Sequence, residues 1–433
     1  MRTGFMKRLN AVFLAALLCS PTFADESWPQ FRGPTGQGIA AECVVPDHFD
    51  QKTGMRWRTE IEGKGWSSPV VSDGKIWLTT AIEHERMQVK VKGETKDVAS
   101  GLNLKVLCLD FATGKQLREI QLAEIKEAQP IHALNTYASP TPVIVGDKVI
   151  CHFGTYGTWC LNAGSGETIW KKQVIVDHSV GPGSSPIVHG QHLILVCDGI
   201  DSQFVAALNL DTGEEVWRTA RPPMTANSDE MKKAYSTPIV IEVNGKTQIA
   251  APGAQWICSY DPETGKELWR AKHGDGFSTS PSAVYWGGMV VFSTGFMRPE
   301  MVAVRADGSG DVTDSHIAWR VKRGAPNKPS PIVAGGNLYM MADNGIMTQV
   351  GPDGEERWQE RLGGNYSASL IGSGDRIFVC SHEGIVTVVK AGDKYSELAK
   401  NELAGEGRLM ASPAIVNGDL LIRSENSLMR FGK

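Results

Sequence analysis

The sequence predicts an all-β fold, a single eight-bladed β-propeller of four-stranded antiparallel blades that spans residues 25–433. Two observations predict it. A short strand-forming repeat recurs eight times along the chain, and the last copy is incomplete while its missing part stands near the N-terminus. The first observation indicates repeated blades, and the second indicates that the blades close into a ring.

The repeat begins with Ser or Thr followed by proline, and continues as a few β-branched residues, a Gly/Asp/Asn turn and a second apolar run. Its copies start at Ser68-Pro69, Thr141-Pro142, Ser185-Pro186, Thr237-Pro238, Ser280-Pro281, Ser330-Pro331, Ser369-Leu370 and Ser412-Pro413. They lie about 50 residues apart on average, which is typical of four short strands with their turns. Each copy therefore predicts one blade.

A second element follows the copies and has the form Asp/Asn-x-x-Thr/Ser-Gly-x-x-x-Trp, seen best at Asn162–Trp170, Asn209–Trp217 and Asp261–Trp269. Asp, Asn and Gly tolerate the positive φ angles of tight turns, so the element predicts the turn between the third and fourth strands. The indole on the fourth strand is expected to pack against the neighbouring blade, burying roughly 200 Å². Other residues expected at this position are Trp319, Trp358, Arg118 in the first blade and Leu398 in the seventh.

The eighth copy runs to Phe431, and the chain stops where a turn and a tryptophan strand are due. The missing element stands before the first copy, as Asp50-x-x-Thr53-Gly54-Met55-Arg56-Trp57, one residue shorter than its relatives. The N-terminal segment is therefore predicted to supply the outer strand of the last blade. Such closure removes the exposed sheet edges that invite aggregation.

The first 24 residues are typical of a secretory signal peptide. A basic start is followed by an apolar run over residues 11–18 and by small residues before Ala24, where cleavage is expected. The apolar run is too short to span a membrane, and no later stretch could do so. Cys19 follows Leu17-Leu18 rather than a small residue, which argues against a lipoprotein. The chain is therefore predicted to be periplasmic or secreted.

Charge and cysteine content exclude further classes. Acidic residues outnumber Lys and Arg by 48 to 44, so nucleic acid is not an expected partner. The cysteines after Ala24 are odd in number and stand singly in apolar runs, as buried small hydrophobic side chains do: Cys43, Cys108, Cys151, Cys160, Cys197, Cys258 and Cys380. One pair stays open, because a hairpin at 154–157 could set Cys151 opposite Cys160 in a disulfide; otherwise both remain thiols.

The Ser-Pro strand followed by Asp261-x-x-Thr264-Gly265-Lys266-Glu267-Leu268-Trp269 resembles the repeat of the pyrroloquinoline-quinone-like (PQQ-like) propellers. That family includes quinoprotein alcohol dehydrogenases and the barrel assembly lipoprotein BamB. The resemblance covers nearly the whole chain after residue 24, and the opening Trp28-Pro29-Gln30-Phe31-Arg32-Gly33-Pro34 is similar to the start of many secreted members. These motifs are specific to a fold and leave the function open.

The resemblance implies what a quinoprotein dehydrogenase would need: an adjacent cysteine pair, acidic and amide calcium ligands, and an aspartate base in long insertions. The sequence has no Cys-Cys step and no Cys-x-x-Cys-His haem motif. No catalytic residue of that family can be assigned, and neither a cofactor nor a metal site is expected.

Residues just before each Ser/Thr-Pro step are expected to ring one mouth of the axial channel, because the innermost strands begin there. They are polar and aromatic: Trp66, Asn135, Tyr137, His178, Tyr235, Lys328, Tyr366 and Arg408. One interpretation is a rim that binds a peptide or small ligand. The other is that these side chains plug the channel and bond to water and to loop backbone.

Two segments depart from the repeat. A charged insertion at residues 83–104 makes the first interval long, and is either a recognition element or a solvated hairpin. The second is a basic run that either meets an acidic partner or forms a solvated loop, and it comprises Arg320, Lys322, Arg323 and Lys328.

The leading hypothesis for the function is a non-catalytic, monomeric scaffold that binds an envelope protein or peptide, peripheral to the outer membrane as the resemblance to BamB implies. The alternatives are a PQQ-dependent dehydrogenase and a carbohydrate-binding or sensing module.

Overall fold

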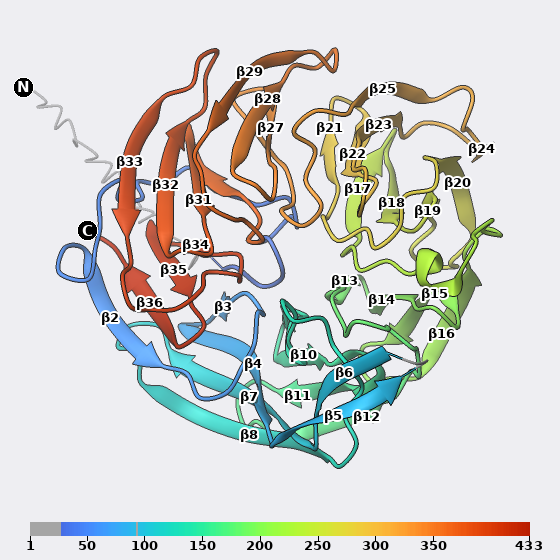
Figure 1. Ribbon diagram of the computed structural model, residues 1–433. Helices are drawn as coiled ribbons and strands as arrows, with labels where there is room; N and C mark the ends of the chain where they lie inside the picture. The colour runs from blue at the N-terminus through green and yellow to red at the C-terminus, as the bar shows by residue number, and fades with distance from the viewer. Residues whose placement is uncertain (1–26, 92–93) are drawn as a thin grey trace, which may run out of the picture.

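The computed structural model describes residues 27–91 and 94–433. The predicted signal peptide, with Cys19 and Ala24, lies outside the described residues. Eight sheets stand around a central axis, as Figure 1 shows, and each is built on four antiparallel strands. The predicted eight-bladed β-propeller is confirmed.

The blades follow one another along the chain, and the first seven each run from the innermost to the outermost strand, whereas the eighth takes its outermost strand from the N-terminal segment. The first four blades contain β3 (Val70–Ser72), β4 (Lys75–Glu83), β7 (Leu102–Asp110) and β8 (Gln116–Ile125); β9 (Val143–Val145), β10 (Lys148–His152), β11 (Thr158–Asn162) and β12 (Thr168–Lys172); β13 (Ile187–His189), β14 (His192–Asp198), β15 (Gln203–Asn209) and β16 (Glu215–Ala220); and β17 (Ile239–Val243), β18 (Lys246–Pro252), β19 (Trp256–Tyr260) and β20 (Glu267–Lys272).

The last four blades contain β21 (Val284–Trp286), β22 (Met289–Ser293), β23 (Met301–Arg305) and β25 (Ile317–Val321); β26 (Ile332–Ala334), β27 (Asn337–Met341), β28 (Ile346–Val350) and β29 (Glu356–Arg361); β30 (Ile371–Ser373), β31 (Arg376–Cys380), β32 (Ile385–Lys390) and β33 (Glu397–Glu402); and β34 (Ala414–Val416), β35 (Asp419–Arg423), β36 (Ser427–Phe431) and β2 (Met55–Glu60). The remaining elements are β1 (Ile39–Ala40), the hairpin of β5 (Arg86–Val91) and β6 (Glu94–Ala99), β24 (Gly310–Asp311), and the 3₁₀ turns η1 (Gly154–Tyr156) and η2 (Asp229–Lys232).

The burial of the strands explains their sequence pattern, in which apolar runs are followed by strands whose apolar and polar residues alternate. A middle strand such as β14 lies between two neighbouring blades, and all of its residues are buried. An outer strand such as β2 alternates between partly buried and exposed residues, because one of its faces meets solvent. The apolar clusters therefore lie between adjacent blades and continue around the ring.

The two ends of the chain share the last blade, as predicted. β2 pairs antiparallel with β36, with Met55 opposite Phe431 and Trp57 opposite Arg430, and in Figure 1 the blue strand lies beside the red one. The ring closes by this N-terminal strand.

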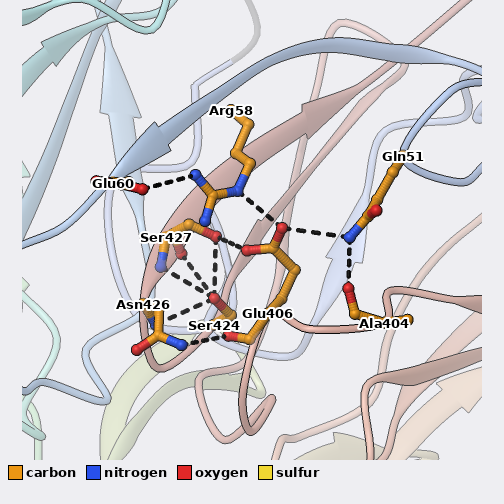
Figure 2. Close-up of polar contacts among 8 residues, drawn as sticks. All are labelled: Gln51, Arg58, Glu60, Ala404, Glu406, Ser424, Asn426 and Ser427. Carbon is orange, nitrogen blue, oxygen red and sulfur yellow. Dashed lines mark hydrogen bonds and ion pairs between the residues drawn. The ribbon is translucent and has the colours of Figure 1, made fainter.

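A buried carboxylate joins the same two ends. Glu406, which is 4% exposed, accepts hydrogen bonds from Arg58 Nε at 2.7 Å and from Ser427 Oγ at 2.5 Å, and Gln51 Nε2 lies 3.4 Å away. Figure 2 shows that these partners approach from the N-terminal segment and from the last hairpin. Because Arg58 lies on β2 and Ser427 on β36, the carboxylate connects the strands that close the ring.

The predicted packing of the outer tryptophans is confirmed and has a regular geometry. The indole nitrogen of Trp217 donates to the Pro262 carbonyl of the next blade at 3.1 Å. Four other indoles make the same bond to the next blade's turn, at 3.0, 2.8, 3.1 and 3.4 Å for Trp57, Trp170, Trp319 and Trp358. In the first blade Arg118 takes the indole's place and donates to the Gly164 and Ser165 carbonyls of the next turn.

Trp269 is an exception in its hydrogen bond. It is fully buried, but its indole nitrogen donates to Gln248 Oε1 of the same blade at 2.9 Å. The next blade reaches it through β24, which pairs in parallel with β20 and sets Gly310 opposite Trp269. The longer connection between β23 and β25 therefore replaces the usual turn carbonyl.

In four of the turns, at Gly114, Gly213, Gly265 and Gly354, the glycine makes room for the indole of the preceding blade, which leads to a first prediction. A Cβ at Gly265 would stand 2.4 Å from the Trp217 ring, whereas a Cβ at Gly245 of the same blade would meet nothing within 4 Å. Both glycines have similar positive φ, +70° and +74°. Gly245→Ala is expected to cost about 1 kcal/mol for the left-handed backbone alone. Gly265→Ala is expected to cost a further ~1–3 kcal/mol from overpacking.

Urea unfolding of the two variants measures that difference. Equal losses of unfolding free energy would show that the indole yields freely, and would contradict tight packing between blades.

Two residues expected at defined positions of the repeat are wrong, because the structure places there the residue one or two positions further along the chain. In the fifth blade the innermost strand begins at Val284, so Ser282 rather than Ser280 stands where the other blades have their Ser or Thr. In the seventh blade Ala399 pairs with Val388 at the tryptophan position, and Leu398 falls in the adjacent bulge. The other blades have the same bulge, but in the seventh blade the connection from Val389 to its partner Glu397 is one residue longer than the connection from Leu208 to Glu215 in the third, which moves the position from Leu398 to Ala399.

The disulfide alternative is also wrong. Cys151 pairs with Trp159, and Cys160 pairs with Ile150, so the two cysteines are one register position apart. Their side chains therefore point to opposite faces of the blade, into different apolar clusters. All seven described cysteines are free.

Candidate functional site

A ring of hydroxyl groups surrounds the axis where the innermost strands begin. At six of the steps between blades, the backbone N–H of one ring residue donates to the hydroxyl of the next. These bonds run from Ser68 to Thr141, Thr141 to Ser185, Ser185 to Thr237, Ser282 to Ser330, Ser330 to Ser369 and Ser369 to Ser412, at 2.9 to 3.1 Å. The Ser/Thr of each repeat therefore couples neighbouring blades at the axis.

The N-terminal residues 28–40 cross the channel and close it from the other side. Trp28 exchanges two backbone hydrogen bonds with Val71 of the first blade, at 2.9 and 2.8 Å. The segment then crosses to the seventh blade, where β1 pairs in parallel with β30. The motif that opens the chain thus has a structural role, since its Trp28 packs on Gly33 and its Arg32 donates to the Pro331 carbonyl.

Together the ring and the crossing segment form a cup of about 120 Å³ at the axis. Phe31 belongs to its floor, and hydroxyls of the ring line its wall. The other lining side chains include Trp66, Ser139, Tyr235, Ser280, Lys328, Ser367 and Met410. The cup can hold water or the tip of an inserted side chain, since sites for small molecules usually measure about 300–1,000 Å³.

Three of the residues expected at the rim line this cup: Trp66, Tyr235 and Lys328. Each is held by a partner. Trp66 Nε1 donates to the Leu134 carbonyl at 3.0 Å, Tyr235 donates to the His178 carbonyl at 2.7 Å, and Lys328 Nζ lies 3.0 Å from Asp343. The rim is therefore rigid rather than a set of free side chains.

The other five expected rim residues do not line the cup. Tyr137 and Tyr366 are buried in clusters between blades, and Asn135 donates to the carbonyls of Val180 and Pro182. His178 is 7% exposed, and Arg408 lies on the exposed surface 3.5 Å from Glu425. All eight residues come shortly before a copy of the repeat, so this position in the sequence does not distinguish the residues that line the cup from those that are buried.

Sequence reasoning missed the floor and the wall of the cup. Phe31 stands in the opening motif, and nothing local in the sequence places it at the axis. The hydroxyls were a stronger signal, because Ser or Thr recurs at every copy of the repeat. That recurrence could have identified them as a ring of lining groups.

Buried histidines near this face predict how stability depends on pH. Burial lowers the pKa of His152 to about 3, and the pKa of His178 and of His273 to about 4. In the unfolded chain a histidine has a pKa of about 6.5. As the pH falls below about 6.5, the unfolded state therefore binds protons before the folded state does. The stability that the neutral histidines contribute above this pH is lost as the pH falls toward 4.

The free energy of unfolding is expected to fall by about 1.4 kcal/mol per pH unit for each histidine between these limits. Urea unfolding at pH 7.5, 6 and 4.5 measures the slope, and His152→Gln should reduce it. The turn aspartates with a lowered pKa, such as Asp110 and Asp261, contribute only at lower pH. A constant free energy from pH 7.5 to 4.5 would contradict neutral burial of the histidines.

The two segments that depart from the repeat make contacts of different kinds, ion pairs in the basic run and strand pairing in the insertion. Within the basic run, Arg320 and Lys322 lie 3.1 and 3.6 Å from Glu300. The insertion forms the separate hairpin β5–β6, which overlaps the second blade in the view of Figure 1. Among the described residues, no three His, Cys, Asp or Glu side chains are grouped to hold a metal, and no helix is long and apolar enough to cross a membrane.

Comparisons with known proteins agree with this fold. The family model described as outer membrane protein assembly factor BamB matches residues 86–219 and 253–431, which is more than half of the chain. The chain is similar to BamB from Moraxella catarrhalis, with 17% identity and a TM-score of 0.52, over 77% of this chain and 98% of that one. No curated protein sequence matches the chain.

Two further solved structures share the fold. Quinohemoprotein alcohol dehydrogenase from Comamonas testosteroni has 11% identity and a TM-score of 0.64, over 94% of this chain and 81% of that one. The computationally designed protein Ika8 has 11% identity and a TM-score of 0.56, over 86% and 98% of the two chains. At these identities the likeness concerns the fold alone.

Proposed function

Because the chain belongs to the family of the outer membrane protein assembly factor BamB, we propose that it is a non-catalytic scaffold that binds an envelope protein or peptide at the cup face of the propeller. The observation that supports this most is the cup itself. It is a small, rigid recess with an aromatic and cationic rim, suited to one inserted side chain rather than to a reacting molecule.

The sequence supports a location for this binding. The signal peptide predicted at residues 1–24 would export the chain, which then meets its partner in the periplasm or at the outer membrane. We propose that it acts there as a peripheral monomer.

A PQQ-dependent dehydrogenase is the alternative that the shared fold raises. The quinone and its calcium ion do not fit the cup. Its volume of about 120 Å³ is below the usual range for a small-molecule site, and none of the described residues that line it has a carboxylate to bind calcium. This misfit favours the scaffold.

Site-specific photo-crosslinking in envelope preparations tests the proposal. A benzophenone amino acid at Lys328 or Ser367 is expected to give discrete adducts with one protein partner. The same probe at Ile169, which is 44% exposed on the outer strand β12, is the control and should give none. Equal adducts at all three positions, or none at the cup, would contradict binding there.

A second measurement addresses the enzyme directly. Purified protein is mixed with pyrroloquinoline quinone and calcium, and dye-linked oxidation of alcohols or sugars is followed. No turnover is expected, and saturable turnover would replace the scaffold by the dehydrogenase.

A further inference from the structure

A second, larger recess lies on the other side of Phe31 from the cup. It has a volume of about 410 Å³, within the usual range for a binding site, and it runs between the crossing segment and the innermost strands of the third and fourth blades. Phe31 and Thr237 line both recesses. We call the larger one the inner-strand groove and define it by Phe31, Thr35, Gln37, Val188, Val240 and Glu242.

The groove lies where the crossing segment leaves strand edges uncovered. In the first, second and seventh blades, the backbone of this segment forms hydrogen bonds with the innermost strands, through Val71, Ile144 and Gly372. In the fifth blade, the Tyr285 N–H donates to Gln37 Oε1. Among the described residues, none forms such a bond to the channel edge of β13 or β17.

The free backbone groups of β17 can be identified. Val243 and Lys246 flank the two-residue Asn244-Gly245 turn, so they form a hydrogen-bonded pair of the hairpin. Residues alternate along the strand, and Val240 and Glu242 therefore direct their N–H and C=O groups away from β18. Both residues line the groove. β17 also has five residues, whereas the other innermost strands have three.

We propose that the inner-strand groove binds an extended segment of a partner protein, which adds to β17 as a further strand and carries Lys or Arg opposite Glu242. The chain shows this mode of pairing within itself, since its own β1 adds in parallel to the innermost strand of the seventh blade. Strand addition supplies affinity through the backbone, and the pockets beside it supply specificity.

Charge sets the chemistry of the occupant. Glu242 is the only Asp, Glu, Lys or Arg side chain among the described residues that line the groove, and it is exposed. The rest of the lining is apolar or uncharged, apart from His189, and favours β-branched residues on either side of the cation. The strand β17 lies between the two stretches that the family model matches, residues 86–219 and 253–431.

Selection of linear heptapeptides displayed on phage against the purified full-length protein tests the proposal. We expect the selected peptides to contain Lys or Arg within β-branched residues. Val240→Pro, which removes an N–H that faces the groove and leaves the pairing with β18 intact, should weaken their binding at least tenfold. Val333→Pro, the same change at the middle of the innermost strand of the sixth blade, is the matched control and should leave binding unchanged.

Two more variants separate the contribution of the space in the groove from that of the charge on Glu242. Thr35→Trp places a bulky ring from an exposed position into the groove and should abolish binding, while Glu242→Gln should weaken basic peptides and spare neutral ones. Peptides that bind equally to the native protein, Val240→Pro and Thr35→Trp would overturn the proposal, as would a failure to select any peptide. A native dimer that Thr35→Trp dissociates would also overturn it, because a second copy would then fill the groove.

These outcomes are independent of the cup. If no peptide binds at the groove but the probe at Lys328 still gives adducts, the groove proposal is wrong and the proposed scaffold function stands. If peptides bind at the groove but the probe gives no adducts, only the groove proposal stands.

Discussion

Deletion of residues 25–60 is expected to leave the protein unfolded or aggregated. The deletion removes β2, exposes the edge of β36, and takes away Trp28, Val45 and Phe49, which are all buried in the cluster that joins the last blade to its neighbours. The expected loss exceeds about 5 kcal/mol, which is comparable with the whole stability of many domains. Soluble yield and thermal unfolding measure it.

A matched deletion shows that the effect comes from ring closure rather than from shortening. Replacing residues 87–98 by Asn-Gly removes the β5–β6 hairpin, which forms its own two-stranded sheet outside the blades. This variant is expected to unfold close to the native temperature. Glu406→Ala, which keeps β2 but leaves Arg58 without its buried acceptor, should lose about 1–3 kcal/mol. Native-like stability of the 25–60 deletion would contradict closure by the N-terminal strand.

Asp198→Asn is expected to lower the free energy of unfolding by about 3–5 kcal/mol, because it leaves a buried guanidinium without its counter-charge. Asp198 and Arg221 are joined by two hydrogen bonds of 3.0 and 2.8 Å, and their side chains are 0% and 1% exposed. Arg221 also donates to the Ala251 carbonyl at 2.8 Å, which ties the third blade to the fourth. Burial opposes the charge, but the adjacent carboxylate raises the pKa of Arg221 well above its ordinary value.

The same blade offers a control for this prediction. Arg218 and Glu215 lie 2.6 Å apart, but both side chains are partly exposed, so Glu215→Gln should cost at most about 1 kcal/mol. The double variant Asp198→Leu/Arg221→Met should be more stable than Asp198→Asn, since it removes both charges together. Similar losses for Asp198→Asn and Glu215→Gln in urea unfolding would show that the buried pair has no special role.

Much of the site escaped prediction, for reasons that differ between residues. Trp66, Tyr235 and Lys328 were placed at the cup because the repeat locates the start of each innermost strand. Tyr137 and Tyr366 share that position in the sequence but turn between blades, where apolar burial outweighs exposure at the rim. Phe31 lines the cup together with residues as distant in the sequence as Ser330 and Ser412, and a local pattern does not encode that proximity.

The sequence by itself determined the number of blades, the strand shared by the two chain ends and the indole that packs against the next blade. These follow from local periodicity and from contacts between adjacent repeats, which recur often enough to be recognised. Only the tertiary structure decided the position of Ser282 in the hydroxyl ring, the separation of Cys151 from Cys160, and the path of residues 28–40 across the axis. One added residue in a strand reverses the face of every side chain beyond it, and a single crossing segment has no repeat to reveal its path.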